Sequence, residues 1–445
     1  MKATRGAASA LMIAGLGIAE DARAGAFELF GVGPAGVAEV SARVARADDG
    51  SAAFYNPAGL AMGRGFVIEL APTFGVSALS AQGKRLPLAD PFGSTLAIAL
   101  PLPFEGAVAK RIRLGFAAYL PTTLLHFIAR PGTEPFFPYY DNRSQRLVLL
   151  PALGVRISDR LALGASLNVL GGVKGPAQVL PGASGALESR IALRATTTVA
   201  LNVGLRFDLD ERVRFGITFR QRFALPAVVS TRAEVAGVPI HVDVRTESAL
   251  YDPLTLVVAG SFALGAATFE LDASYARWSD WDGPYAAVTA QLPGVNLTSD
   301  LPPHPGRDVV SLRGAAAYGL DLGTRTRLEL HGGAGFEPSM LKSVRQGRTN
   351  LVDGDKVSLG LGAELRLREP FARVRALRFG AGLGTQIVPP STQEKRACAA
   401  FPCPADTVAG PDAGAPGVGI DNPGFPRLVG GGSLWSASLG LGVEL

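Results

Sequence analysis

The stretch Val199-Ala-Leu-Asn-Val-Gly-Leu-Arg-Phe-Asp208 decides the fold class of this chain, because its apolar residues recur at every second position. Leu201, Val203 and Leu205 share one face of an extended strand, and small or polar residues share the other. A short polar turn at residues 208–211 (DLDE) leads to residues 213–220, where the same alternation resumes. Two alternating segments joined by a short polar turn predict a β-hairpin.

The two-residue period extends outward from this hairpin over most of the chain, from residue 64 onward. We predict strands near 65–77, 94–102, 110–127, 144–157, 160–175, 189–208, 212–230, 249–264, 267–280, 307–320, 325–338, 355–368, 374–389 and 432–445. A soluble sandwich also alternates, but an even number of long strands is typical of bacterial outer-membrane barrels. We therefore predict an all-β fold, a 14-stranded antiparallel transmembrane β-barrel over residues 64–445.

The composition agrees with a barrel and argues against other classes. The 445 residues include 55 glycines, 47% are hydrophobic and only 18% are charged, which is too apolar for a disordered chain. The longest uncharged runs are about 17 residues and contain Pro and Gly, whereas a spanning helix needs about 20 apolar residues. The 43 Lys and Arg are interspersed with 38 acids, so we expect no nucleic-acid partner.

The N-terminus has the features of a secretory signal. Lys2 and Arg5 precede an apolar run at residues 7–19 (AASALMIAGLGIA), and residues 22–24 (ARA) form a cleavage site. A buried N-terminal helix is the alternative. We predict a signal peptide over residues 1–24 and a mature chain from Gly25.

The connections between the predicted strands alternate between short and long. Outer-membrane barrels have short periplasmic turns and long extracellular loops, so both chain ends fall on the periplasmic side. The long loop 390–431 contains Cys398 and Cys403, which either form a small disulfide or remain free thiols. A zinc site needs four ligands, and no further Cys or His lies nearby, so we expect no metal.

Residues 25–63 do not follow the two-residue period. A segment of about 40 residues with little apolar bulk cannot form a core alone. We predict that it packs in the barrel lumen as a plug, with one helical turn. Asp49 or Ser51 caps this turn, and Asn56-Pro57 ends it, because the residue before a proline disfavours helix.

Residues 47–51 (ADDGS) and 55–60 (YNPAGL), following the predicted signal, resemble the N-terminal plug of the long-chain fatty acid transporter family, known as FadL, whose relatives transport toluene and xylene. Residues 114–119 (LGFAAY), 275–281 (YARWSDW), 335–339 (GFEPS) and 353–362 (DGDKVSLGLG) resemble strands and turns of the same family. The resemblance covers nearly the whole mature chain.

The resemblance implies a monomeric, plugged barrel in the Gram-negative outer membrane, in contact with its lipid and lipopolysaccharide. It implies passive uptake of long-chain fatty acids or other hydrophobic molecules, with lateral exit through the wall and no cofactor. The plug motif would be Asn56, Pro57 and Ala58, which either gates the tunnel or is only a structural turn. Pro121 would mark a wall opening in the third strand, unless that strand ends near Leu120.

Two departures from the family and three rival functions remain. The chain ends in Leu445 where such barrels usually end in Phe, and loop 128–143 is short. The rivals are a general porin or structural barrel without a hydrophobic ligand, a soluble periplasmic β-protein, and a membrane-embedded hydrolase. A hydrolase needs a base beside a nucleophile. The histidine that shares a face with an acid is His331, with Glu329, which fits a polar lumen pair, so we expect no enzyme activity.

Overall fold

A computed structural model describes residues 26–86, 92–102, 104, 106, 109–122, 135–140, 147–174, 177–181, 187–191, 194–235, 238–283, 287–292, 295–298, 305–345, 350–395 and 424–445. The predicted signal peptide at residues 1–24 and the pair Cys398 and Cys403 lie outside these residues. No helix among the described residues is long and apolar enough to cross a membrane.

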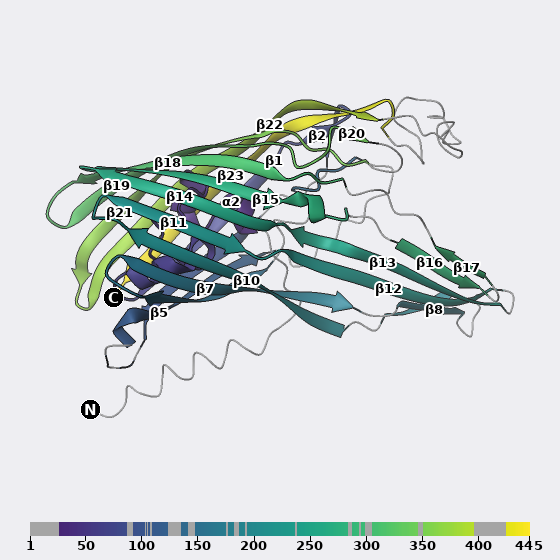
Figure 1. Cartoon of the computed structure of the whole chain (residues 1–445), viewed down its shortest axis with the longest axis horizontal. Coiled ribbons are helices and arrows are strands. Elements are labelled where there is room, and N and C mark those ends of the chain that lie inside the picture. The colour runs from purple at the N-terminus through teal and green to yellow at the C-terminus, as the bar shows by residue number, and fades with distance from the viewer. Residues whose placement is uncertain are drawn as a thin grey trace.

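Fourteen long strands form a closed antiparallel barrel, so the predicted fold class is confirmed (Figure 1). They are β1 (Val67–Ser77), β4 (Phe92–Pro101), β5 (Ile112–Pro121), β6 (Val148–Arg156), β7 (Leu161–Lys174), β10 (Arg194–Asp208), β11 (Val213–Arg220), β14 (Leu254–Leu264), β15 (Ala267–Arg277), β18 (Val309–Asp321), β19 (Thr326–Glu337), β21 (Lys356–Phe371), β22 (Val374–Lys395) and β23 (Arg427–Glu444). Each strand pairs with the next, and β1 closes the barrel against β23, from Val67↔Glu444 to Ser77↔Leu434.

The two ends of the barrel differ, as the alternating connections predict. Links of only a few residues join β6 to β7, β10 to β11, β14 to β15, β18 to β19 and β21 to β22, and all lie at one end with the last strand residue Glu444. A link with a short helix, η3 (Ala109–Arg111), also lies there. The opposite end carries the long connections, including the short strands β2 (Ser80–Ala81), β3 (Lys84–Arg85) and β20 (Val344–Arg345).

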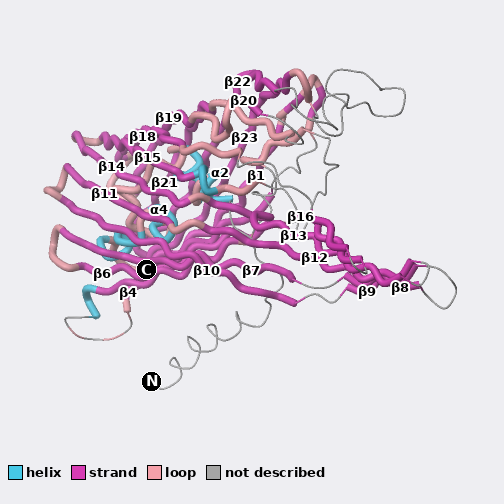
Figure 2. Tube along the Cα trace, turned by 45° about the vertical axis from the view of Figure 1, so that its right-hand side comes forward, coloured by secondary structure: helices cyan, strands magenta, loops and turns pink. Residues whose placement is uncertain are grey.

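Part of the long-loop prediction is wrong. The stretches 231–248 and 281–306, expected as loops, contribute to a separate four-stranded sheet of β12 (Phe223–Val235), β13 (Val238–Asp252), β16 (Ala287–Leu292) and β17 (Val295–Thr298). This sheet projects beyond the long-loop end of the barrel (Figures 1 and 2). A hairpin of β8 (Ala177–Pro181) and β9 (Leu187–Ile191) begins in the connection predicted at 176–188 and extends into the strand predicted at 189–208.

The two faces of the barrel wall have different side chains. Large apolar side chains such as Leu70, Phe215, Leu271 and Leu361 are exposed on the outside, the surface expected of a membrane-spanning barrel. The inward positions between them carry glycine, alanine and polar residues. The buried core therefore lies inside the barrel instead of between two layers.

Residues 26–62 lie inside the barrel, where Figure 2 shows their helices as cyan segments within the ring of strands. They form α2 (Ala26–Phe30), α3 (Gly33–Ala38), α4 (Ala52–Tyr55) and the 3-10 helix η2 (Pro57–Met62). Asp49 accepts hydrogen bonds from the backbone and side chain of Ser51 just before α4, and Asn56 follows the helix in an extended conformation. We call residues 26–62 the lumen segment.

Candidate functional site

Helix η2 and the residue before it hold the lumen segment against the wall formed by β6, β7 and β10. Nδ2 of Asn56 donates to the carbonyls of Val44 and Leu205, both at 3.0 Å, and Oδ1 accepts from the backbone of Ala58 at 3.2 Å. Asn56 is fully buried, so these bonds replace the water that its amide loses. One side chain thus joins two parts of the lumen segment to barrel strand β10.

A second attachment is electrostatic and centres on Glu39, just after α3. Its carboxylate lies 2.7 Å from Arg43, 2.9 Å from Arg46 and 2.8 Å from Nδ1 of His331 on β19. Burial alone would raise the pKa of Glu39, but the two arginines and His331 outweigh it, and the pKa falls to about 2. The predicted pairing of His331 with Glu329 is therefore replaced by a bond between His331 and the lumen segment.

A third attachment comes from two carboxylates on β15. Glu270 accepts from the backbone of Ala45 at 2.6 Å and pairs with Arg46 at 2.6 Å. Asp272 accepts from the backbone of Val44 at 3.4 Å. Hydrogen bonds and ion pairs from the barrel strands β10, β15 and β19 therefore hold the lumen segment in place.

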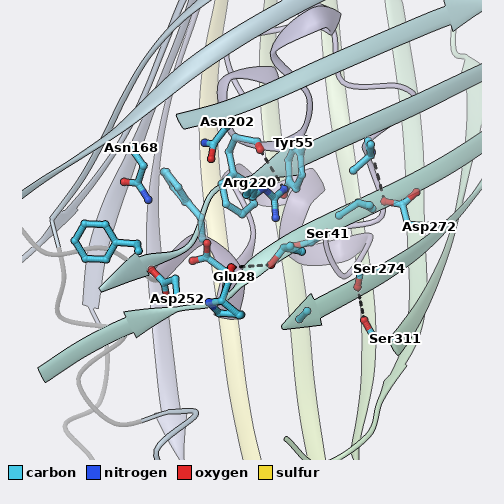
Figure 3. Close-up of a pocket in the computed structure, with 18 of the residues that line it drawn as sticks. Glu28, Ser41, Tyr55, Asn168, Asn202, Arg220, Asp252, Asp272, Ser274 and Ser311 are labelled. Atoms are coloured by element: carbon cyan, nitrogen blue, oxygen red, sulfur yellow. Dashed lines mark hydrogen bonds between the residues drawn. The ribbon is translucent and has the colours of Figure 1, made fainter. Parts of the chain in front are cut away.

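Above this segment, toward the long-loop end, lies a partly open cavity of about 90 Å³. Its apolar lining includes Phe27 and Phe54 from the lumen segment and Val148, Leu150, Phe223 and Trp278 from the barrel and its loops. Figure 3 shows polar residues entering from the wall, with Asn168 and Asn202 on one side and Ser274 and Ser311 on the other. The cavity therefore has an apolar part and a polar part.

A cluster of aromatic side chains adjoins the cavity on the long-loop side. Tyr139 and Trp278 line it, and their ring centroids lie 6.4 Å apart. Tyr251 lies 5.6 Å from Trp278, and Trp281 packs edge-on against Trp278 at 5.9 Å. All four side chains are buried. A molecule that enters from the long-loop end would meet this aromatic cluster before the cavity.

The short-turn end of the barrel has the opposite character. A wide cavity of about 980 Å³ opens there, and apart from Met62 and Val67 its lining consists of seven arginines and seven acids. Arg378 lies 3.5 Å from Asp49 of the lumen segment and 3.3 Å from Glu444. Charged side chains at this density keep water, so this mouth offers no favourable path to an apolar molecule.

Two prolines, Pro121 on β5 and Pro151 on β6, lie in the wall section β5–β7. Among the described residues, which leave out 141–146, the β5–β6 ladder reaches Tyr119↔Val148, and β5 is paired with β4 as far as Pro121↔Gly93. The β6–β7 ladder has Leu149↔Val169 and resumes at Ala152↔Ser166 in the same register. Pro151 lies in that interval, and its missing N–H accounts for the two missing pairs.

Solved structures with this architecture include a FadL homologue from Pseudomonas aeruginosa, 13% identical with a TM-score of 0.57, covering 95% of this chain and 99% of that one. The P. putida toluene transporter TodX is 13% identical with a TM-score of 0.56, covering 94% and 99%. The Ralstonia pickettii toluene transporter TbuX is 15% identical with a TM-score of 0.53, covering 94% and 100%. The chain has the FadL-type barrel fold. No protein-family model and no curated protein matches it.

The residues predicted as a site lie in two separate places. Asn56, Pro57 and Ala58 are buried at the join between α4 and η2, and Pro121 is the last residue of β5. Their proposed roles remain predictions. Sequence reasoning missed the lining of this cavity, because its wall residues come from strands β6 to β19 and no local motif links them. It also missed Pro151, although a proline within a strand pattern is a visible signal.

Proposed function

We propose that this protein is a channel of the Gram-negative outer membrane through which hydrophobic molecules enter by passive diffusion. The observation that carries this proposal is the aromatic-lined cavity between a buried lumen segment and the long-loop end of a FadL-type barrel. Two of these structural neighbours are named as toluene transporters, and the third as a FadL homologue. The barrel closes on itself within one chain, which supports a monomer that contacts only membrane lipid and lipopolysaccharide.

The cavity size favours small hydrophobic molecules over long acyl chains. Its volume of about 90 Å³ is below the roughly 150 Å³ of an engineered apolar cavity that admits benzene. A single ring needs only modest side-chain movement to enter, whereas an extended fatty acid needs a much larger rearrangement. Toluene is therefore a better first test ligand than oleate.

A general porin is the main competing function, and ion conductance separates the two. A lumen filled by residues 26–62 predicts rare and small openings in planar lipid bilayers, whereas a porin gives a large and steady conductance. In cells, we expect uptake of labelled toluene to rise when the protein is present and uptake of oleate to change less. Equal toluene uptake with and without the protein would overturn the proposal.

We further propose that the ligand leaves sideways, through the wall section β5–β7. The charged short-turn mouth argues against axial exit, and both Pro121 and Pro151 remove hydrogen-bond donors from this section. Pro151 lies on the same strand as the cavity residues Val148 and Leu150. This section of the wall therefore has fewer hydrogen-bond donors between its strands and lies beside the cavity.

Substituting alanine for each proline tests this exit route. Pro151→Ala restores an N–H to the β6–β7 ladder, so we expect slower toluene uptake with an unchanged amount of folded protein in the membrane. Pro121→Ala is the matched variant at the earlier predicted opening. If only Pro121→Ala slows uptake, the opening lies in β5, and if neither does, lateral exit through this section is wrong.

A further inference from the structure

Asn168 on β7 differs from the other uncharged side chains that line the cavity. Its Oδ1 is buried and has no hydrogen-bond partner among the described residues. Three other uncharged polar groups of the lining are paired within the protein: Asn202 donates to Ser166 at 3.1 Å, and the hydroxyls of Ser274 and Ser311 lie 2.6 Å apart. An unmatched buried acceptor costs free energy until a donor reaches it.

The charged groups of the cavity disfavour an anionic ligand. Four acids line it, Glu28, Asp252, Asp272 and Glu337, against the two guanidinium groups of Arg220 and Arg313. Arg313 pairs with Glu337 at 3.3 Å. Arg220 faces Phe54, donating to its carbonyl at 3.1 Å, with its guanidinium carbon 4.2 Å from the ring centroid. A carboxylate entering this space would lose its hydration and meet more carboxyl groups than guanidinium groups.

We propose that the cavity selects an uncharged aromatic molecule that carries a hydroxyl group, and that this hydroxyl donates to Oδ1 of Asn168. The apolar lining, with Phe27, Phe54 and Trp278, accommodates the ring, and Asn168 accepts a hydrogen bond from its hydroxyl group. This inference rests on the proposed function and names the ligand class of the same site. The acceptor lies beside the wall interval at Pro151, so recognition precedes exit.

A matched ligand series tests the selection directly. Toluene, para-cresol and para-toluate share one methylated ring and differ in having no polar group, a hydroxyl and a carboxylate. We would measure their affinities for the purified full-length barrel in detergent by isothermal titration calorimetry. One hydrogen bond to an unmatched acceptor predicts that para-cresol binds about 2- to 10-fold more tightly than toluene. Para-toluate is expected to bind most weakly of the three.

Variants at Asn168 assign the preference to this side chain. Asn168→Leu keeps the approximate size and removes the acceptor, so para-cresol loses its advantage while toluene binds as before. Asn202→Leu is the matched control, because that amide faces the same cavity but already bonds Ser166. Heat-modifiable migration in a gel verifies that each variant is folded, and the ligand series on the unmodified protein needs no variant.

The outcomes separate this inference from the proposed function. Equal affinity for toluene and para-cresol would overturn the role of Asn168 while leaving the hydrophobic channel intact. Para-tolualdehyde can only accept hydrogen bonds. Tight binding of para-tolualdehyde or para-toluate would mean that Arg220 or another hydrogen-bond donor of the protein contacts the polar group of the ligand. This result would also overturn the role of Asn168. If none of the ligands binds, and if cells with and without the protein take up toluene equally, the proposed function itself is contradicted.

Discussion

Glu39 is a buried charged residue through which the lumen segment is docked to the barrel wall. The docked state holds its pKa at about 2, against an ordinary value of 4.5. A lowered pKa stabilises the docked state fully at pH values above 4.5, and this contribution declines as the pH falls toward 2. The shift corresponds to roughly 3 kcal/mol, which is large for one side chain.

Acidification is therefore expected to loosen the lumen segment. In planar bilayers, openings should become more frequent as the pH falls from 5 to 3, because protonated Glu39 no longer pairs with Arg43, Arg46 and His331. Glu39→Gln should show frequent openings already at pH 6 and a weaker pH dependence. Glu329→Gln, a lumen carboxylate on the same strand as His331, is the control. A Glu39→Gln channel as quiet as the unmodified one at every pH would refute this role.

At the scale of elements, helix α3 ends in an unusual way. The backbone N–H of Ser41 bonds the carbonyl of Gly36, and that of Val40 bonds the carbonyl of Val37, which is the Schellman arrangement. The residue that follows the helix end is normally glycine because φ is positive there. Here it is Val40 at φ 46°, followed by Ser41 at φ 66°. A β-branched residue in this region is strained.

Relieving this strain should stabilise the docked segment. We expect Val40→Gly to raise its stability by about 1 kcal/mol, measured as slower hydrogen exchange of the backbone amides of residues 36–44. Val32→Gly is the matched control, because Val32 precedes the same helix at φ −104° and is not strained. That variant should exchange faster. Faster exchange in Val40→Gly would mean that the valine side chain contributes more by packing than it costs in strain.

The elements also show what sequence reasoning could and could not predict. The barrel strands were predictable because a wall with lipid on one side imposes a strict two-residue period. Helices α2 and α3 were missed because five or six residues are too few to form a helix without docking. Strands β12 and β13 were assigned in part to a loop, although residues 240–245 alternate. The register of β12 and β13 breaks between Leu225 and Ala227, and a proline follows β13. The boundary between the barrel strands and the projecting sheet is therefore hard to locate from the sequence.

At the scale of the whole molecule, the close approach of the lumen segment to the barrel wall explains part of the high glycine content. Several inward-facing glycines lie where the backbone of the lumen segment approaches the wall most closely. A Cβ at Gly204 would lie 2.0 Å from Oδ1 of Asn56, and one at Gly382 would lie 2.2 Å from the carbonyl oxygen of Pro34. The wall and the lumen segment therefore have complementary shapes. Because this complementarity depends on atoms of both parts, it cannot be inferred from either part of the sequence alone.

Adding one methyl group to the wall should test this fit. Gly204→Ala must displace the amide of Asn56, which bonds both Val44 and Leu205, so we expect docking to weaken by about 1–3 kcal/mol. Planar bilayers should then show frequent, larger openings. Gly314→Ala is the control, because the nearest atom to its added methyl lies 3.8 Å away and the channel should stay quiet. If Gly204→Ala stays equally quiet while folded, the lumen segment is not what closes the barrel, and a structural or porin-like function becomes the better account.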